Sequence, residues 1–227
     1  MIIDFNITNF CNAKCPTCKR FDVDNYLQLT PGLKLVHMEL KEFEFVLDKN
    51  RNFFYGKICY FCGEFGDPLM HPFIKEFAQL ANKVFKEVVV YTNGGLNRKD
   101  FFDYSILPDN NVTIRFGIDG LTSESNNKYR IDVNTDLAYK NMFYVANHKK
   151  TLWDFTLFEH NKHEIEDIIK LVDEHSNLFL NIRCNLRPDF HGVNRIKRED
   201  YDAYCELANK YFFNDRVTFD KFWVDCK

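Results

Sequence analysis

Short apolar runs that alternate with amphipathic helical patterns constrain the fold of this chain more than any other feature of its sequence. Runs typical of strands span 2–8, 57–61, 87–91, 112–117, 154–158 and 178–184. Helical spacing of apolar residues is clear over 71–85 and 162–175, and weaker over 38–49, 136–147 and 200–211. Strands that alternate with helices in this way are typical of βαβ units, which build a parallel sheet.

The length of the chain limits how many such units it contains. At 227 residues it is shorter than the ~250 residues typical of a complete eight-unit barrel. We therefore predict an α/β fold, a partial (β/α)6 TIM-like barrel of parallel strands, formed by residues 1–186. Residues 187–227 are predicted to form a C-terminal helical extension or cap. A partial barrel leaves a lateral opening, which suits a large substrate.

Composition and charge narrow the function classes. The net charge of −3 gives no global basic field that favours nucleic acid, although it does not exclude RNA. The sequence has no run of 18 apolar residues, so we expect no membrane span. It also shows no signal peptide. Eight cysteines without a signal peptide predict a reducing, cytoplasmic location, with thiols used for metal or catalysis rather than for disulfides.

Three of these cysteines stand close together just after the first predicted strand. Cys11, Cys15 and Cys18 have the spacing C-x3-C-x2-C. Three thiolates on one loop can hold three irons of a cubane cluster, which leaves the fourth iron free for a substrate or cofactor. The alternatives are a zinc knuckle or chance clustering, although zinc sites usually pair two C-x2-C units or one such unit with two histidines.

Turn-rich polar motifs follow the next predicted strands. They are Gly66-Asp67-Pro68, Thr92-Asn93-Gly94-Gly95 and Phe116-Gly117-Ile118-Asp119-Gly120. Two further polar pairs, Tyr129-Arg130 and His160-Asn161, come later in the chain. Parallel α/β folds place their chemistry at the carboxyl ends of the strands, so these motifs are expected to share one rim with the cysteines. Taken alone, each motif is also compatible with an ordinary turn, a surface arginine or a helix N-cap.

The cysteine spacing and the order of these motifs resemble the radical SAM (S-adenosylmethionine) superfamily. The resemblance is closest to the branch that carries SPASM or twitch extensions. Cys226 is followed by Lys227 alone, so we expect no complete accessory cluster domain. Three positions depart from the family pattern: Asp67 replaces the commoner Glu, Gly117 replaces Ser, and Thr17 replaces an aromatic residue.

The resemblance implies one 4Fe–4S cluster on the three cysteines and SAM bound at the open iron. The implied SAM contacts come from Thr17, Gly66, Asp67, Thr92, Asn93, Gly117, Asp119, Arg130 and Asn161. It also implies an oxidoreductase or transferase reaction in which reductive cleavage of SAM gives a 5′-deoxyadenosyl radical that abstracts hydrogen from a substrate.

The partners implied are an electron donor of flavodoxin or ferredoxin type and a substrate that is a peptide or a small metabolite. The alternative is a non-catalytic protein that binds a cluster or zinc, and SAM, as a regulator or scaffold.

Overall fold

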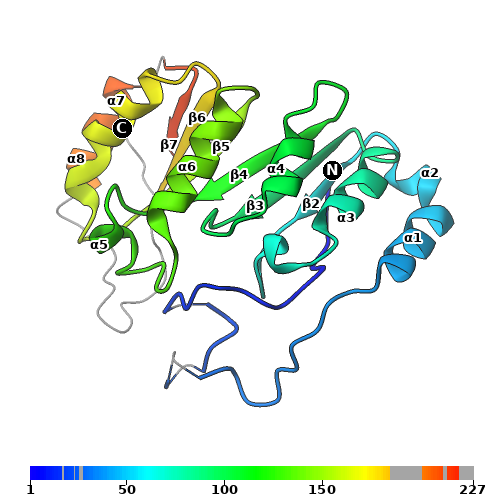
Figure 1. Cartoon of the computed structure of the whole chain (residues 1–227). Helices are drawn as coiled ribbons and strands as arrows, with labels where there is room; N and C mark the ends of the chain where they lie inside the picture. The colour runs from blue at the N-terminus through cyan, green and yellow to red at the C-terminus, as the bar shows by residue number, and fades with distance from the viewer. Residues whose placement is uncertain (17, 23, 26–27, 185–200, 212–213, 220–227) are drawn as a thin grey trace.

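The computed structural model describes the chain except for residues 17, 23, 26–27, 185–200, 212–213 and 220–227. A parallel sheet of seven strands, ordered β1 to β7 as in the sequence, forms its centre (Figure 1). The strands are β1 Ile2–Asp4, β2 Ile58–Phe61, β3 Glu87–Thr92, β4 Val112–Gly117, β5 Thr151–Leu157, β6 Leu178–Cys184 and β7 Val217–Phe219. The order is linear, with β1 and β7 at opposite ends, so the α/β partial barrel of parallel strands is confirmed.

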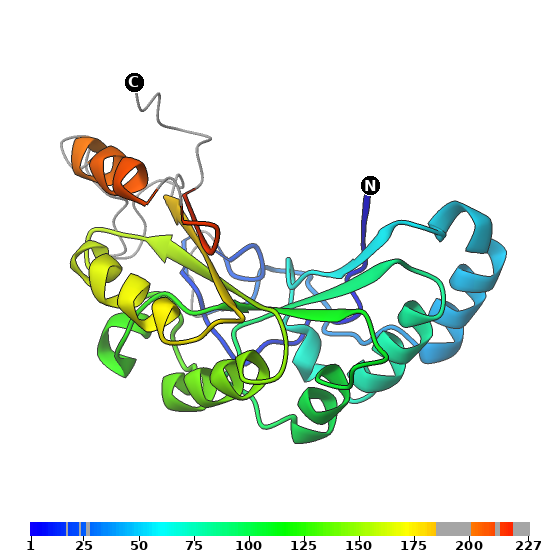
Figure 2. The same ribbon diagram turned by 90° about the horizontal axis from the view of Figure 1, so that it is seen from above.

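Helices follow most strands, as the alternating pattern predicts. They are α1 Leu40–Lys49, α2 Arg51–Phe54, α3 Ile74–Asn82, α4 Lys99–Ser105, α5 Ser123–Asn126, α6 Thr135–Ala146, α7 Ile165–Asp173 and α8 Tyr201–Lys210, with 3-10 turns at Pro68–Met70 and Lys162–Glu164. Figure 2 shows α3, α4, α6 and α7 along one face of the sheet.

The main core lies between this face of the sheet and the helices. The apolar stripe predicted for α3 is buried at Ile74, Phe77 and Ala81. Large strand side chains meet the helices from the other side, among them the fully buried Phe116 and Trp153. Burying such side chains stabilises the fold by roughly 1.5–3 kcal/mol each. The helical periodicity therefore located the contact surface as well as the helices.

The first strand is shorter than predicted. It ends at Asp4 instead of continuing to residue 8, because residues 7 and 8 pair with a later segment. The Met38 N–H donates to the Ile7 carbonyl at 2.8 Å, and Thr8 forms an antiparallel bridge with His37. The apolar run was real, but its second half has a different partner.

The described residues also contain a strand that the sequence did not predict. β7 pairs in parallel with β6, from Leu180 opposite Val217 to Ile182 opposite Phe219. Its three residues are too few for a recognisable strand pattern, and this explains why only six strands were expected. The division at residue 186 stays a prediction, because 185–200 lie outside the described residues.

The use of cysteine and the apolar character of the helices were both predicted from the sequence. Cys205, on α8, is disulfide-bonded, so the expectation that thiols would be used for metal or catalysis rather than disulfides is wrong for this residue. Within the described part of the chain, no helix has both the length and the apolar character needed to cross a membrane.

The sheet face turned away from the helices has a different character. Alternation along each strand places a row of polar side chains on this open face, comprising Tyr60, Tyr91, Arg115, Asp154 and Arg183. Neighbouring strands bring some of them side by side, since Tyr91 is opposite Arg115 in the register of β3 and β4. One sheet thus has an apolar face under the helices and a face that carries polar side chains.

Candidate active site

A cavity of about 680 Å³ lies at the carboxyl ends of the strands. This volume is within the ~300–1,000 Å³ typical of small-molecule sites. Segments that follow β1, β2 and β3 line it, together with residues at the ends of β5 and β6. The motifs singled out in the sequence therefore meet at one rim, as the parallel topology requires.

The three clustered cysteines line this cavity from the loop after β1. Cys15 is buried, Cys11 and Cys18 are partly buried, and all three are free thiols. The loop turns tightly, because the Cys18 N–H donates to the Cys15 carbonyl at 3.0 Å. Across the described residues, no three Cys, His, Asp or Glu side chains are arranged to hold a single metal ion.

Burial favours the protonated form of the Cys11 and Cys15 thiols. It raises the pKa of Cys11 to about 12 and the pKa of Cys15 to about 11. Two guanidiniums oppose this effect, Arg20 beside Cys11 and Arg130 beside Cys15. Positive charge next to a thiol favours the thiolate, which is the form that ligates iron.

Arg20 has a further property that bears on what the cavity holds. Its side chain is 5% exposed, it lines the cavity, and its Nε has no hydrogen-bond partner among the described residues. A buried charged donor without a partner is costly. Three thiols and a guanidinium with an unsatisfied donor form a set that fits an electron-rich iron–sulfur cluster.

Gly66 and Asp67 lock the cysteine loop to the end of β2. A Cβ on Gly66 would lie 2.5 Å from the Thr8 carbonyl oxygen and 2.7 Å from that of Phe10, so only glycine allows this close approach. The next residue continues the contact, since the Asp67 N–H donates to the Phe10 carbonyl at 2.8 Å. The glycine thus serves backbone packing at this point.

The Asp67 carboxylate is occupied by donors from the chain itself. It is 3% exposed and accepts from the Leu69 N–H at 2.9 Å, the Thr92 hydroxyl at 2.9 Å and the Asn93 N–H at 2.8 Å. Burial raises the pKa of Asp67, against the opposing effect of these hydrogen bonds. The carboxylate therefore ties the end of β3 to the segment after β2.

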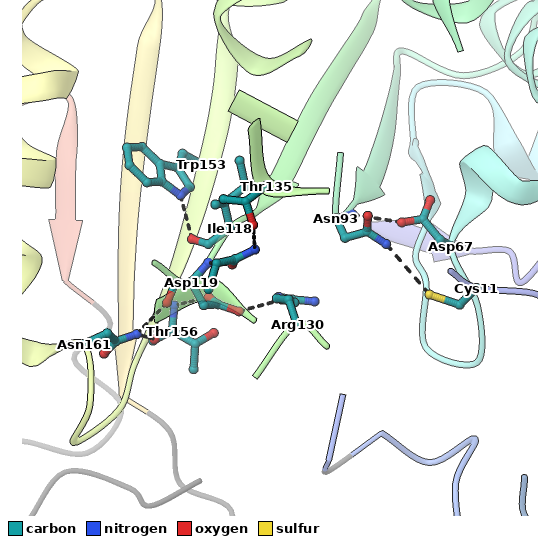
Figure 3. Close-up of polar contacts among 11 residues, drawn as sticks. Cys11, Asp67, Asn93, Ile118, Asp119, Arg130, Thr135, Trp153, Thr156 and Asn161 are labelled. Atoms are coloured by element: carbon teal, nitrogen blue, oxygen red, sulfur yellow. Dashed lines mark hydrogen bonds and ion pairs between the residues drawn. The ribbon is translucent and has the colours of Figure 1, made fainter. Parts of the chain in front are cut away.

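Asn93 carries this connection on to the cysteines. Its side-chain amide donates to Asn12 Oδ1 at 2.8 Å and approaches Cys11 Sγ at 3.8 Å, while its oxygen accepts from the Gly95 N–H at 2.9 Å. Figure 3 shows Asn93 linked to both Asp67 and Cys11. The motif after β3 therefore fixes the position of the first cysteine.

On the other side of the cavity, Asp119 holds Arg130. Asp119 is fully buried, and its Oδ2 lies 2.6 Å from Arg130 Nε, while its Oδ1 accepts from the Thr156 N–H at 2.6 Å. Gly117 makes room for this pair, because a Cβ there would lie 2.7 Å from both Arg130 Nη2 and Tyr91 Oη. A side chain at position 117 would therefore displace the ends of the Arg130 and Tyr91 side chains.

Asn161 holds the backbone of Asp119 and Thr156 in place. It is fully buried, and its amide donates to the carbonyls of Asp119 at 2.8 Å and Thr156 at 2.9 Å. Its oxygen accepts from the Phe158 N–H at 2.7 Å. The residue stands at the N-cap of a 3-10 turn, but its side chain makes no capping bond there, so the N-cap interpretation is wrong for the side chain.

The structure divides the expected site residues into two groups. The lining contains the three cysteines with Gly66, Asp67, Thr92, Asn93 and Arg130. Gly117, Asp119 and Asn161 lie behind it and position Arg130. Thr17 lies outside the described residues. Sequence reasoning did not single out Tyr91, Thr156 and Arg183, which also line the cavity. The available signal is a polar side chain near the carboxyl end of a largely apolar strand.

Comparison with known proteins gives one family match and one curated relative. The model of the radical SAM superfamily matches residues 5–172. The antilisterial bacteriocin subtilosin biosynthesis protein AlbA of Bacillus subtilis (strain 168) is 29% identical over 128 residues, which cover 56% of this chain and 26% of AlbA. The chain thus spans about a quarter of the length of that relative.

Solved structures share the fold at low sequence identity. Streptococcus suis SuiB bound to S-adenosylmethionine superposes with a TM-score of 0.72 at 15% identity, over 96% of this chain and 49% of SuiB. The protein anSMEcpe with bound AdoMet superposes with a TM-score of 0.71 at 16% identity, over 97% of this chain and 64% of that protein. At such identities the likeness establishes the architecture.

Proposed function

Because the chain belongs to the radical SAM superfamily, whose model matches residues 5–172, we propose that it cleaves SAM reductively and modifies a peptide. The superfamily uses a 4Fe–4S cluster and SAM. When bound, they supply a 5′-deoxyadenosyl radical that takes a hydrogen atom from the substrate. The observation that carries the proposal is that three thiols of one loop line a cavity together with polar groups from the ends of several strands.

Cys11, Cys15 and Cys18 are the proposed cluster ligands. Their thiols lose protons on binding iron, and the guanidiniums of Arg20 and Arg130 favour that loss. Residues 8–10, Asp67 and Asn93 hold the loop in place. This support restricts where the ligating sulfurs lie before any metal enters.

Arg130 is the proposed partner of the SAM carboxylate. Its Nε is engaged by Asp119, and its side chain lines the cavity, where a guanidinium can pair with a carboxylate. Thr92, Asn93 and the backbone of Gly66 supply polar groups on the other side. Asp67 and Asn161 act in this proposal by positioning, because the chain itself engages their oxygens.

A peptide is the substrate class that the relatives favour. SuiB has been solved bound to the precursor peptide SuiA, anSMEcpe with AdoMet and a Cp18Cys peptide, and AlbA is a subtilosin biosynthesis protein. The electron would come from a donor of flavodoxin or ferredoxin type, because the proposed cleavage needs a one-electron reductant. A small metabolite remains the other substrate class.

The test is anaerobic reconstitution with iron and sulfide, followed by reduction with dithionite in the presence of SAM. We expect about four irons per chain, broad absorbance near ~400 nm and formation of 5′-deoxyadenosine. Cys15→Ala should abolish iron loading and 5′-deoxyadenosine together. Cys59→Ala is the matched control, because this thiol is buried in the main core. Retained SAM cleavage in Cys15→Ala would refute the ligand assignment.

A second candidate is a SAM-binding scaffold that keeps its cluster but does not cleave SAM. The engagement of the Asp67 carboxylate by three donors of the chain favours it, because the resemblance gives this position to a group that holds the amino group of SAM. Full iron loading without 5′-deoxyadenosine would select this candidate. One zinc per chain in a colourless protein would select a zinc site instead.

A further inference from the structure

The open face of the sheet carries a charged group that the proposed cluster and SAM contacts do not use. It consists of Arg115 on β4, Asp154 on β5 and Arg183 on β6. We call these three residues the Arg–Asp–Arg site. Arg183 lines the main cavity, whereas Arg115 and Asp154 line an adjoining cavity of about 290 Å³. The site therefore stands where the two cavities approach each other.

Its two guanidiniums are held in different ways by one carboxylate. Arg115 Nε and Nη2 both donate to Asp154, each at 2.7 Å, in a bidentate pair. Arg183 Nη2 lies 3.1 Å from Asp154 Oδ2 in a single contact. The side chain of Asp154 is 1% exposed and that of Arg115 is 21% exposed, whereas that of Arg183 is 39% exposed. Arg183 is thus the accessible member.

Asn181, next to Asp154 in the β5–β6 register, orients the accessible guanidinium. With its amide oxygen turned toward the arginines, Asn181 accepts from Arg183 Nε at 2.7 Å and donates to Thr218 Oγ1 at 3.0 Å. In the reverse orientation the amide nitrogen donates to Asp154 Oδ1 at 3.3 Å but also faces the Arg183 guanidinium, so the shorter bond from Arg183 Nε favours the first orientation. Asp154 and Asn181 together hold one edge of the guanidinium.

The charges of the site do not balance. Two guanidiniums share one carboxylate, and no second carboxylate lies within ion-pair distance of either arginine in the described part of the chain. Burial raises the pKa of Tyr60, a neighbour on the same face, to about 12, which keeps it neutral. Across the cavity, Glu64 pairs with Lys19. Among the described residues, the two guanidiniums and the one carboxylate of the site sum to one positive charge.

We propose that Arg183, oriented by Asp154 and Asn181, binds a carboxylate side chain of the peptide substrate. This inference rests on the proposed function for the identity of the ligand as a peptide. A guanidinium edge matches a carboxylate in shape and charge. A single surplus positive charge beside Asp154 matches a singly charged carboxylate better than a phosphate. The substrate residue that reacts would then lie near an Asp or Glu of the same peptide.

Two peptides with blocked ends test the proposal on the reconstituted, SAM-bound protein. Acetyl-Ala-Ala-Glu-Ala-Ala-amide and its Gln counterpart differ only in the carboxylate. Affinities are read by NMR from the arginine Nε–H resonances. We expect the Glu peptide to bind at least about tenfold more tightly, because a hydrogen bond to a charged group is worth about 1.5–3 kcal/mol. The preference should fall as salt is raised.

Variants assign the preference to one residue. Arg183→Gln should remove it, and Arg183→Lys should keep part of it, because the charge remains while the fork is lost. Lys99→Gln is the matched charge control, since this exposed lysine on α4 pairs with Asp103 on the same helix, and it should leave the preference intact. Thermal unfolding of each variant identifies one that fails to fold, and Arg183→Lys then carries the test.

Equal affinity of the wild-type protein for both peptides would overturn the proposal. So would a preference that survives Arg183→Gln, or a phosphoserine peptide that binds tenfold more tightly than the Glu peptide. These outcomes are independent of 5′-deoxyadenosine formation. A protein that cleaves SAM but shows no preference loses only this inference, and one with the preference but no cleavage loses only the proposed reaction.

Discussion

The two faces of the sheet differ although the same strands build both. On the helix face, Trp153, Phe116 and their neighbours are fully buried in one apolar core. On the open face, successive strands present Tyr91, Arg115 and Asp154, and the last two form an ion pair. The helix face holds the apolar core, and the open face contributes Tyr91, Thr156 and Arg183 to the lining of the cavity.

The largest expected difference between the two faces is in how much a substitution lowers the free energy of unfolding. Trp153→Ala should lower the free energy of unfolding by about 3–5 kcal/mol, because it leaves a cavity in the core and removes the indole bond to the Ile118 carbonyl at 2.9 Å. Leu152→Ala changes the adjacent residue, which is half-buried on the open face, and should cost about 1 kcal/mol. Urea unfolding measures both, and equal costs would contradict the division.

The rate of alkylation should also differ between a cysteine on the helix face and one that lines the cavity. Cys59 is fully buried against the helices, whereas Cys62 lines the cavity. Burial, with smaller contributions from Asp4 and Glu64, raises the pKa of Cys62 from 9.0 to about 11. Because the thiolate is the reactive form, iodoacetamide at pH 8 should modify Cys62 roughly a hundredfold more slowly than a thiol with the ordinary pKa.

The sign of the pH dependence follows from the same shift. Below its raised pKa the thiol is mostly protonated, so the alkylation rate of Cys62 should increase about tenfold per pH unit up to pH near 11. Cys59 should react only after unfolding. Mass spectrometry of the reconstituted protein distinguishes the two thiols, with Cys62→Ala as the control. Modification of Cys59 before Cys62 would show that the faces are assigned wrongly.

The smallest expected effect concerns how precisely the open face is packed. Gly117→Ala places a Cβ 2.7 Å from Arg130 Nη2 and Tyr91 Oη, so the guanidinium must move. We expect SAM affinity to fall by about tenfold, or ~1.4 kcal/mol, while iron loading is unchanged.

Equilibrium dialysis with labelled SAM measures this change. Adding Tyr91→Phe to Gly117→Ala removes one of the two clashing atoms and should restore part of the affinity. Unchanged SAM binding in Gly117→Ala would show that Arg130 does not need its present position.

Sequence patterns predicted the helix face well, because burial there depends on local periodicity. β4 and β6 have the predicted bounds, and the apolar stripe of α7 is buried at Ile165, Ile168 and Val172. β1 was predicted too long, since the partner of residues 7–8 is 37–38, about thirty positions away. No local pattern records such a partner.

The roles of residues at the strand ends and on the open face were harder to predict for a related reason. The motifs at the strand ends were located correctly at the cavity, but the roles of single residues depend on neighbours that are distant in sequence. Asp67 faces Thr92 and Asn93, and Asn161 faces Asp119; the sequence alone cannot show that these side chains are already engaged. The sequence identified Arg115, Asp154 and Arg183 only as strand residues. Their charges interact because the folded sheet places β4, β5 and β6 side by side.

The linear order of the strands has a consequence for the size of what can reach the cysteines. β1 and β7 stand at the two ends of the sheet and do not pair with each other. A sheet that never completes a ring can be approached from its flank. For the described residues, access from that flank would not require either end of a long polymer to pass through a pore.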